Sequence, residues 1–355
     1  MRILLTTELY QSGQSTHVID LASQLNNLGH SVQIVVTGIF LKDFTTSYGA
    51  ILKASSIPYL VSKNIQQIHR LIQDFQPDVL HSHSSTIFAL TSTLAKHSKR
   101  PYILTCHGLG FSHPKYQRSL QEAAQLIAVG DNSAKELDPE YTHKLAIIPN
   151  GIDTGIFLPK VKEKRLHIYY VGRVNAAKLT ALSALYQAVE SMDTMDLTVV
   201  GNHCPAFLQV RFLPWQTNLQ DLLGHTNIVA ACGRTAREAL SCGNAVLLLN
   251  HKYDGIISPK IVKRSDFSFS GNTQRYPLHS IRHDLEQFVA DRRRLTKLQS
   301  FSRRYATRHL TSQEMAVKTL LVYEKALQLE PIQGPIRLPV RKRIAIPGWG
   351  LSIGV

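Results

Sequence analysis

The chain has 355 residues, of which 44% are hydrophobic, and it carries a formal net charge of +15 at pH 7. A chain of this length exceeds what one hydrophobic core usually serves, so two domains are expected. No apolar run reaches the roughly 18 residues that a membrane-spanning helix needs, which excludes that class of protein. The N-terminal apolar stretch turns polar at Glu8, too early for a secretory signal, and a cytoplasmic protein is therefore expected.

The cysteines and histidines give little support for a metal centre. The four cysteines form no CxxC pair, so reduced thiols are expected rather than a disulfide framework or a zinc site. They are Cys106, Cys204, Cys232 and Cys242. The nearest approach to a ligand pair is His81-Ser82-His83, which is weak alone, and no Asp-x-Asp motif occurs. No metal site is predicted.

The positive charge is concentrated late in the chain. The late basic residues are Arg292, Arg293, Arg294, Lys297, Arg303, Arg304 and Arg308, followed by Arg337, Arg341, Lys342 and Arg343. A basic surface suits nucleic acid, anionic lipid or phosphorylated small molecules. Nucleic acid is not expected, because no helix-turn-helix, zinc finger or aromatic-interleaved basic strand is present. The predicted partner is an anionic membrane surface at the inner membrane face, and the alternative is a solvated helix face.

The first half of the chain alternates strand-like and helix-like segments. Residues 2–6 form an apolar run typical of a strand, and residues 16–28 show the apolar spacing of a helix that ends at Gly29. Further strand-like runs are 32–36, 79–81, 102–105, 126–129 and 146–148. Such alternation indicates a parallel sheet with helices on both faces.

The pattern restarts after a Pro- and Lys-bearing linker at residues 157–164. Its strand-like runs are 166–171, 197–200, 228–231 and 246–249. The predicted fold class is α/β, with two doubly wound Rossmann-like domains facing each other across a cleft. The predicted divisions are an N-terminal domain over 1–160, a C-terminal domain over 161–309, a helix over 310–330 that could cross back to the first domain, and a basic, Pro-containing tail over 331–355.

Residues 228–250 combine strand, turn, helix and strand, and they place one carboxylate, Glu238, in the helix. Backbone amides at a helix start favour anionic oxygen, and a carboxylate can accept from two neighbouring hydroxyl groups. The segment therefore suits a phosphorylated, polyhydroxylated ligand. A surface Glu on an ordinary connection is the alternative.

Three other places carry candidate chemistry. Gly13, in the loop before the first helix, would let the backbone approach a ligand, although a plain turn fits as well. Arg173 closes a strand with Lys178 five residues later, and two such cations suit a diphosphate or are simply surface cations. His107 follows a strand of the first domain, where it could donate to a hydroxyl group or be a satisfied core histidine.

Taken together, the segments resemble the retaining GT-B glycosyltransferases of family 4, over about residues 2–328. The segments that carry the resemblance are Ser12-Gly13-Gln14-Ser15-Thr16-His17-Val18, Leu28-Gly29-His30-Ser31-Val32, Pro77-Asp78-Val79-Leu80-His81-Ser82-His83, Thr105-Cys106-His107-Gly108, Ile148-Pro149-Asn150-Gly151-Ile152-Asp153, Val171-Gly172-Arg173 with Lys178, Val199-Val200-Gly201, and Glu238-Ala239-Leu240-Ser241-Cys242-Gly243. They stand in the order found in that family.

The resemblance implies a retaining, metal-independent transferase of the hexosyltransferase type, without a cofactor, that uses a nucleotide-diphosphate sugar as donor. It casts Arg173 and Lys178 as a diphosphate clamp, Glu238 as the partner of the ribose hydroxyls, and His107 as the histidine beside the transferred sugar. Gly13 would lie near the donor phosphate. The backbone amides of Gly233, Arg234 and Thr235 would meet the sugar or the β-phosphate.

The resemblance also implies an acceptor bound by the first domain, either a saccharide or a lipid-linked molecule of the cell envelope. The chain departs from the family at three places. Ala230 stands where a first carboxylate is usual, Leu179 follows the clamp lysine in place of glycine, and Asn202-His203 follows Gly201. Two alternatives therefore remain open: a nucleotide-sugar epimerase of the same architecture, and a non-catalytic relative that binds nucleotide sugars.

Overall fold

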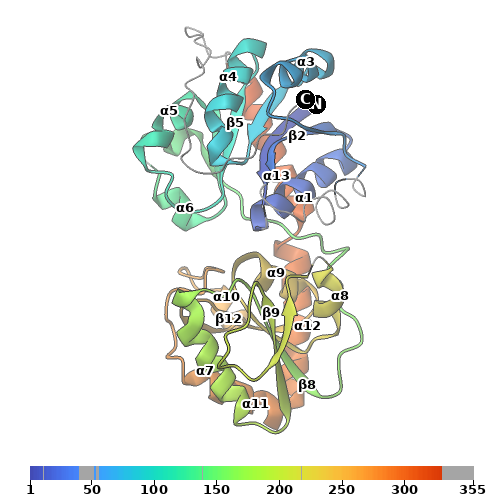
Figure 1. Ribbon diagram of the computed structural model, residues 1–355, viewed down its shortest axis with the longest axis vertical. Helices are drawn as coiled ribbons and strands as arrows, with labels where there is room; N and C mark the ends of the chain where they lie inside the picture. Colours follow the sequence, from blue (N-terminus) through green and yellow to red (C-terminus); the bar gives the residue numbers. More distant parts are fainter. Residues whose placement is uncertain (11, 40–51, 53–55, 138, 217, 330–355) are drawn as a thin grey trace, which may run out of the picture.

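The computed structural model describes residues 1–329 apart from residues 11, 40–51, 53–55, 138 and 217. The chain forms two α/β units that follow one another along the long axis of the molecule, each built around one sheet (Figure 1). The tail predicted over 331–355 lies outside the described residues. None of the helices in the described part is both long and apolar enough to cross a membrane. All four cysteines are free thiols.

Within the described residues, the first sheet has seven strands in the order β3-β2-β1-β4-β5-β6-β7, and every pairing between them is parallel. The strands are β1 (Arg2–Leu9), β2 (Ser31–Ile39), β3 (Tyr59–Val61), β4 (Val79–Ser82), β5 (Tyr102–Cys106), β6 (Gln125–Ala128) and β7 (Leu145–Ile147). The helices between them are α1 (Gly13–Asn27), α3 (Ile65–Phe75), α4 (Phe88–Ser98), α5 (Pro114–Glu122) and α6 (Asp131–Lys135).

Alternate residues of β1 show how the first sheet is covered on both faces. Ile3 and Leu5 join the apolar cluster that includes residues of α1, whereas Leu4 joins the cluster that includes residues of α4. Side chains of a strand point alternately to the two faces of its sheet, so a strand covered on both sides reads as a continuous apolar run.

The second sheet has, within the described residues, six strands in the order β10-β9-β8-β11-β12-β13. The strands are β8 (Leu166–Val171), β9 (Met195–Gly201), β10 (Arg211–Pro214), β11 (Ile228–Ala231), β12 (Ala245–Leu249) and β13 (Tyr253–Ile256). The helices are α7 (Leu179–Glu190), α8 (Leu219–His225), α9 (Gly233–Ser241), α10 (Pro259–Val262), α11 (Ser280–Ala290) and α12 (Arg292–His309). β13 runs antiparallel to β12, so this sheet is parallel except for one edge strand.

The sequence reading missed β3, β10 and β13, and all three are strands at a sheet edge. β3 and β10 hold only exposed or half-buried residues, because an edge strand is not covered as a central strand is. β13 is buried but interrupts its apolar residues with Asp254 and Gly255. An apolar stretch as short as Tyr59–Val61 of β3, or one interrupted as in β13, gives no signal that separates an edge strand from a loop.

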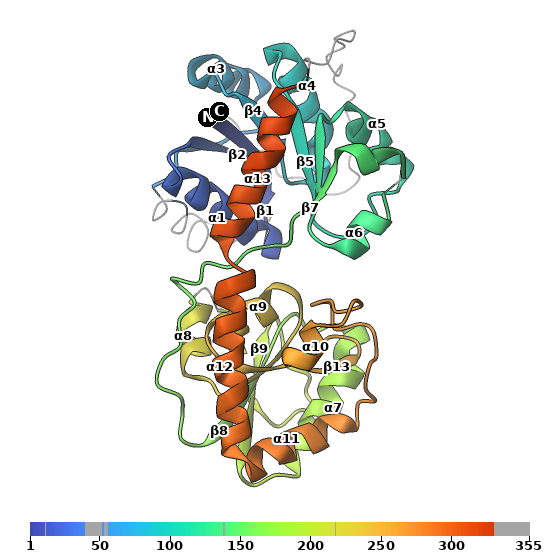
Figure 2. The ribbon, with the colours of Figure 1, turned by 180° about the vertical axis from the view of Figure 1, so that it is seen from behind.

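The helix at the end of the described chain, α13 (Ser312–Leu327), packs on the first unit, although α12 before it belongs to the second (Figure 2). Met315, Val322 and Tyr323 join the same apolar cluster as residues of α1 and β1. Residues of α13, near the end of the described chain, therefore complete the hydrophobic core of the first unit.

The two crossings between the units lie side by side. The backbone N–H of Ile152 donates to the carbonyl of Leu310 at 2.7 Å, and that of Ser312 donates to the carbonyl of Ile152 at 2.9 Å. The first crossing continues into residues 157–164, which run without regular structure as the sequence predicted. In this segment Lys162 donates through Nζ to the carbonyls of Gly224 and Cys242 at 2.9 and 2.8 Å.

The sequence groups Arg303 with the late basic residues that would form a charged surface, but the structure places this side chain among backbone carbonyls. Its guanidinium is half-buried and donates to the carbonyl oxygens of Thr154, Phe157 and Ser241 at 2.9–3.1 Å. Ser241 is the last residue of α9, whose final carbonyls have no partner within the helix, and Thr154 and Phe157 lie in the irregular segment after the first crossing. Arg303 therefore ties α12 to the chain that follows the first crossing.

Candidate functional site

The carboxyl ends of the two sheets meet at the start of α1 and the start of α9. Gly13, after β1, lies so close to Arg234, after β11, that a Cβ on Gly13 would stand 3.5 Å from Cδ of Arg234. Ligands of open α/β sheets bind at the carboxyl ends of the strands. The candidate functional site is therefore the region where these two ends face each other.

Three histidines from separate elements of the first unit gather at this edge. His17 comes from α1, His83 follows β4, and His107 follows β5. The ring centroids of His17 and His107 lie 4.6 Å apart, and Nδ1 of His83 lies 3.1 Å from Nε2 of His107. Neither His17 nor His83 was predicted as a site residue. His17 lies one helical turn after Gly13, which puts both on one face of α1.

Burial keeps these imidazoles neutral. It lowers the pKa of His107 to about 3 and lowers the pKa of His17 and His83 well below the usual value, with the neighbouring histidines adding to the effect. A neutral imidazole has one N–H and one bare nitrogen, so one ring of the His83–His107 pair donates and the other accepts. His83 thereby decides whether Nδ1 of His107 carries a proton.

Several ring nitrogens of this cluster have no hydrogen-bond partner within the described residues. They are Nδ1 of His17, Nε2 of His83 and Nδ1 of His107. Buried polar atoms in folded proteins are nearly always paired, so such atoms mark a place where a ligand, water or ion can bind. Each of the three residues offers a ligand atom, and these atoms lie within 4.8 Å of one another. Among the described residues, His17, His83 and His107 are therefore the group that could bind a transition-metal ion.

His81 makes different contacts from His83, although the two are close in the sequence. Its Nδ1 is 2.7 Å from the hydroxyl of Tyr323 and its Nε2 is 2.7 Å from Oγ1 of Thr105, so both ring nitrogens are occupied. His81 joins β4, β5 and α13 from beneath the cluster. The metal-ligand group is therefore not the His-x-His pair considered from the sequence, because the third ligand comes from α1.

Arg234 connects the second unit to the first. Its Nη2 lies 2.5 Å from Oδ2 of Asp20 on α1, and its Nε lies 2.7 Å from Oε1 of Glu238 one turn later on α9. Its Nη1 donates to the carbonyl of Gly151 at 3.4 Å. Burial raises the pKa of Asp20 and of Glu238, the guanidinium opposes both shifts, and the two carboxylates raise the pKa of Arg234.

This arrangement changes what Glu238 can offer to a ligand. One of its carboxylate oxygens, Oε1, already accepts from Arg234, and the side chain is only 8% exposed. The sequence predicts that Glu238 accepts from two hydroxyl groups. For Arg234 it predicts a contact to the ligand through the backbone amide only. The side chain of Arg234 was missed because its partner Asp20 is distant in sequence.

The start of α9 fits the predicted anion site in part. Gly233 adopts a φ of 60°, a left-handed conformation that favours glycine. Its backbone N–H donates to the carbonyl of Phe269 at 2.6 Å, so the expected contact from this amide to a ligand is wrong in this structure. No side chain caps the helix at Cys232, and the amides of Arg234 and Thr235 belong to this uncapped first turn.

Arg173 and Lys178 lie on the loop between β8 and α7, beside the start of α9. Arg173 is exposed and Lys178 is half-buried. β8 and β11 are neighbouring parallel strands, so the segment after β8 that holds Lys178 lies beside the start of α9, which follows β11. The charge of Lys178 lowers the pKa of Cys232 against the larger effect of burial. The loop is held by Asn202, whose Oδ1 accepts from the N–H of Val174 at 2.7 Å. Asn202, which departs from the glycine usual in the resembled family, therefore holds this loop in place.

In chemical terms, the region offers cations and uncapped amides on the second unit and neutral imidazoles on the first. Cations and helix-start amides stabilise phosphate oxygens, and an unpartnered imidazole nitrogen can hydrogen-bond a hydroxyl group. The structure brings Gly13, Arg234 and Glu238 into one contact group. It places Lys178 beside Cys232 and His107 beside His17.

Residues 11–155 match the model of a family described as Glycosyltransferase Family 4, so the match includes most of the first unit, with Gly13 and His107, but not β1 or α13. Among curated protein sequences, none matches the chain.

The fold has many solved counterparts. A glycosyltransferase from Rickettsia africae ESF-5 is similar with a TM-score of 0.68 and 17% identity, over 92% of this chain and 98% of that one. HepE of Anabaena in complex with UDP and glucose has a TM-score of 0.69 and 13% identity, over 91% and 99%. MnaA of S. aureus with UDP has a TM-score of 0.55 and 14% identity, over 94% and 100%. The chain has the GT-B fold of glycosyltransferases.

Proposed function

We propose that the protein is a glycosyltransferase of family 4 that transfers a sugar from a nucleotide-diphosphate sugar to an acceptor hydroxyl group. The observation that carries the proposal is Lys178 beside the uncapped start of α9, at the carboxyl edge of the second sheet. A cation next to free helix-start amides suits the diphosphate of such a donor. The family match of the first unit and the complexes of HepE with UDP-glucose support the same ligand class.

In this proposal the second unit binds the donor and the first binds the acceptor. The bond between the anomeric carbon and the diphosphate breaks, and the nucleoside diphosphate keeps the electron pair. The anomeric carbon bonds to the acceptor oxygen, whose proton passes to the departing phosphate. Arg173 and Lys178 stabilise the charge that grows on the phosphate, and positioning of the two substrates supplies much of the remaining rate.

The other site residues receive roles that the geometry allows. His107 hydrogen-bonds the transferred sugar, and Gly13 lets the backbone approach the donor phosphate. The amides of Arg234 and Thr235 bind the sugar or the β-phosphate. Glu238 can reach a ribose hydroxyl group only through Oε2, because Oε1 is paired with Arg234.

We further propose that the transfer retains the anomeric configuration, needs no metal ion or cofactor, and builds a cell-envelope polysaccharide or glycolipid at an anionic membrane surface. Retention follows from the family resemblance, and the membrane surface follows from the exposed basic residues of α12. Ala230 and the engaged Glu238 favour one second candidate, a relative that binds nucleotide sugars without transfer.

The proposed function is tested with UDP-glucose first and then with other nucleotide sugars, in the presence of membrane-extracted acceptors. We expect Arg173→Ala and Lys178→Ala each to reduce turnover by roughly a hundredfold, the usual effect of losing one electrostatic contact to a transition state. Arg282→Ala, an exposed cation of α11, is the matched control and should leave turnover unchanged.

Turnover should persist after treatment with EDTA, and the anomeric signal of the product should match that of the donor by NMR. Unchanged turnover in both clamp variants would contradict the clamp. Binding by calorimetry without transfer to any acceptor would favour the second candidate, and an epimerised donor without an acceptor would indicate an epimerase.

A further inference from the structure

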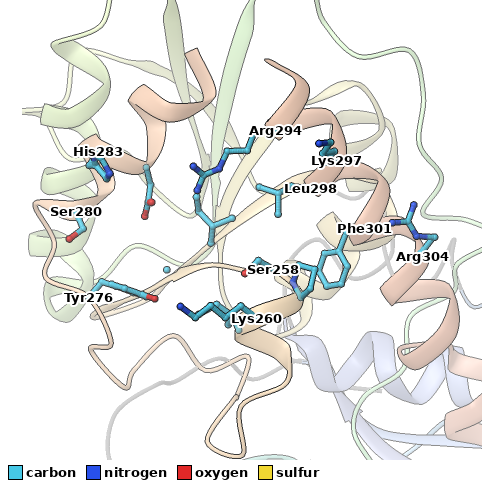
Figure 3. Close-up of a pocket in the computed structure, with 15 residues that line it drawn as sticks. Ser258, Lys260, Tyr276, Ser280, His283, Arg294, Lys297, Leu298, Phe301 and Arg304 are labelled. Carbon is cyan, nitrogen blue, oxygen red and sulfur yellow. The ribbon is translucent and has the colours of Figure 1, made fainter. Parts of the chain in front are cut away.

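A second hollow lies in the second unit, apart from the candidate functional site. It has a volume of about 730 Å³ and is enclosed by the segment from β13 to α10, by α11 and by α12 (Figure 3). It shares no residue with the site described above. β13 runs antiparallel to β12, so the chain leaves β13 away from the carboxyl ends where that site is built. We call this hollow the basic pocket, after Lys260, Arg294, Lys297 and Arg304 in its lining.

One face of α12 supplies most of the chemistry of the basic pocket. Arg294, Lys297, Phe301 and Arg304 follow one another at spacings of three and four residues, which brings them onto the same side of a helix. Figure 3 shows Arg294 on α12 and Lys260 on α10 from different sides of the hollow. Cations from two elements therefore surround one space.

The positive charge of the basic pocket is not balanced within the described residues. None of the four cations forms an ion pair there, whereas the neighbouring Arg282 pairs with Glu286 at 2.8 Å. The pocket lining contains one carboxylate, Asp284, and its Oδ2 accepts from the hydroxyl of Tyr253 at 2.6 Å. A bound anion would balance part of this positive charge and stabilise the arrangement.

The lining also offers apolar surface beside the charges. Leu298 and Phe301 are half-buried on the same face of α12, and Tyr276 is 38% exposed at the opposite wall. The volume is within the usual range of small-molecule sites, roughly 300–1,000 Å³. A matching ligand carries an anionic group joined to an apolar or aromatic part.

We propose that the basic pocket binds a phosphorylated ligand, with its phosphate beside Arg294, Lys297 and Lys260 and its apolar part against Leu298 and Phe301. Phosphate fits better than a single carboxylate, because it offers more acceptor oxygens and up to two charges to an arginine fork and two ammonium groups. The phosphate can belong to a soluble molecule or to the headgroup of an anionic lipid. This proposal does not depend on the proposed transferase activity.

The test uses two probes that share the phosphate and differ in source. Phenyl phosphate is titrated by calorimetry, and vesicles of phosphatidylcholine with and without phosphatidic acid are tested by co-sedimentation. The pocket variant is Arg294→Gln with Lys297→Gln. The control is Arg70→Gln with Lys252→Gln, which removes the same charge from exposed positions outside α12 that do not line the pocket.

We expect the wild-type protein to bind at least one probe, and the pocket variant to bind it at least about tenfold more weakly. The control variant should stay within about twofold of the wild type. Binding of phenyl phosphate would show that the pocket can bind a soluble phosphorylated molecule. Binding of the acidic vesicles but not of phenyl phosphate would indicate that the ligand is a lipid headgroup. Equal weakening in both variants, or no binding of either probe, overturns the proposal. All four substituted side chains are exposed, so folding should be retained and is checked by the melting temperature.

Discussion

Single side chains in the candidate functional site are unusual because they carry buried ring nitrogens without partners. His17, His83 and His107 have neutral rings in close contact, and each leaves a nitrogen without a hydrogen bond within the described residues. Such atoms cost stability in the absence of a ligand. Their presence at this site is explained if a ligand hydroxyl group or an ion binds to the unpaired ring nitrogens.

The buried histidines predict a loss of stability in acid. Burial holds the pKa of His107 at about 3, below its value of 6.5 when unfolded, so the unfolded chain takes up more protons as the pH falls through 6.5. The contribution of His107 is therefore complete above pH 6.5 and is lost at about 1.4 kcal/mol per pH unit below it. His107→Gln should reduce the slope by this amount, measured as the free energy of unfolding in urea between pH 7 and pH 5.

His251→Gln is the control for this measurement, because His251 is exposed. It should leave the slope of the wild-type protein in place. An identical slope in the wild type and in His107→Gln would contradict the assignment of a buried, neutral His107.

At the scale of secondary-structure elements, α1 and α9 are joined by one guanidinium. Arg234 pairs with Glu238 within α9 and with Asp20 on α1, and all three side chains are largely buried. Removing one partner from a buried ion pair leaves the other charge unpaired in a medium of low polarity. The cost is therefore far above that of a surface pair.

We predict that Arg234→Gln lowers the free energy of unfolding by about 3 kcal/mol or more. The matched control is Arg282→Gln, which breaks a pair of the same i,i+4 spacing and similar length on α11, where the side chains are 59% and 48% exposed. That change should cost less than about 1 kcal/mol. Urea unfolding of both variants checks the difference, and equal costs would mean that Arg234 is not buried as described.

A cycle with Asp20→Asn separates the two partners of Arg234. The coupling between Asp20 and Arg234 should lie between about 0.5 and 3 kcal/mol, as for other residues in contact. A coupling near zero would show that α1 and α9 are not joined through this pair in solution.

The whole molecule depends on the two crossings, and Gly151 lies where they pack. A Cβ on Gly151 would stand 2.5 Å from Cα of Ser312 and 2.6 Å from the carbonyl oxygen of Thr311. These are backbone atoms, so relief requires the crossing strands to separate. The start of α13, and with it the cover of the first unit, would then have to shift.

Gly151→Ala is therefore expected to lower the free energy of unfolding by about 1–3 kcal/mol through overpacking. Gly130→Ala is the matched control, since a Cβ there meets nothing within 4 Å. Thermal unfolding of the two variants checks the prediction. A Gly151→Ala variant as stable as Gly130→Ala would show that the crossings tolerate separation.

Much of the fold was predictable from local pattern. The apolar runs that became β1, β4, β5, β8, β11 and β12 are buried on both faces, and the helical spacing before Gly29 marked α1. Three edge strands, β3, β10 and β13, were not predicted, because their apolar stretches are short or interrupted, whereas the edge strand β7 matches the predicted run 146–148. Gly13, His107 and Arg173 were predicted as site residues because each follows a strand, and Glu238 because it lies on the helix after β11; their roles stay predictions.

The sequence by itself determined the two α/β units and the free state of the cysteines, since these depend on residues near one another in the chain or on their spacing. Only the tertiary structure decided that Arg234 meets Asp20, 214 residues away, and that Glu238 is already engaged. It also decided that His17 joins His83 and His107, and that Arg303 binds carbonyls rather than solvent. The physical reason is that hydrogen bonds and ion pairs between distant elements depend on where packing places them, which no local pattern records.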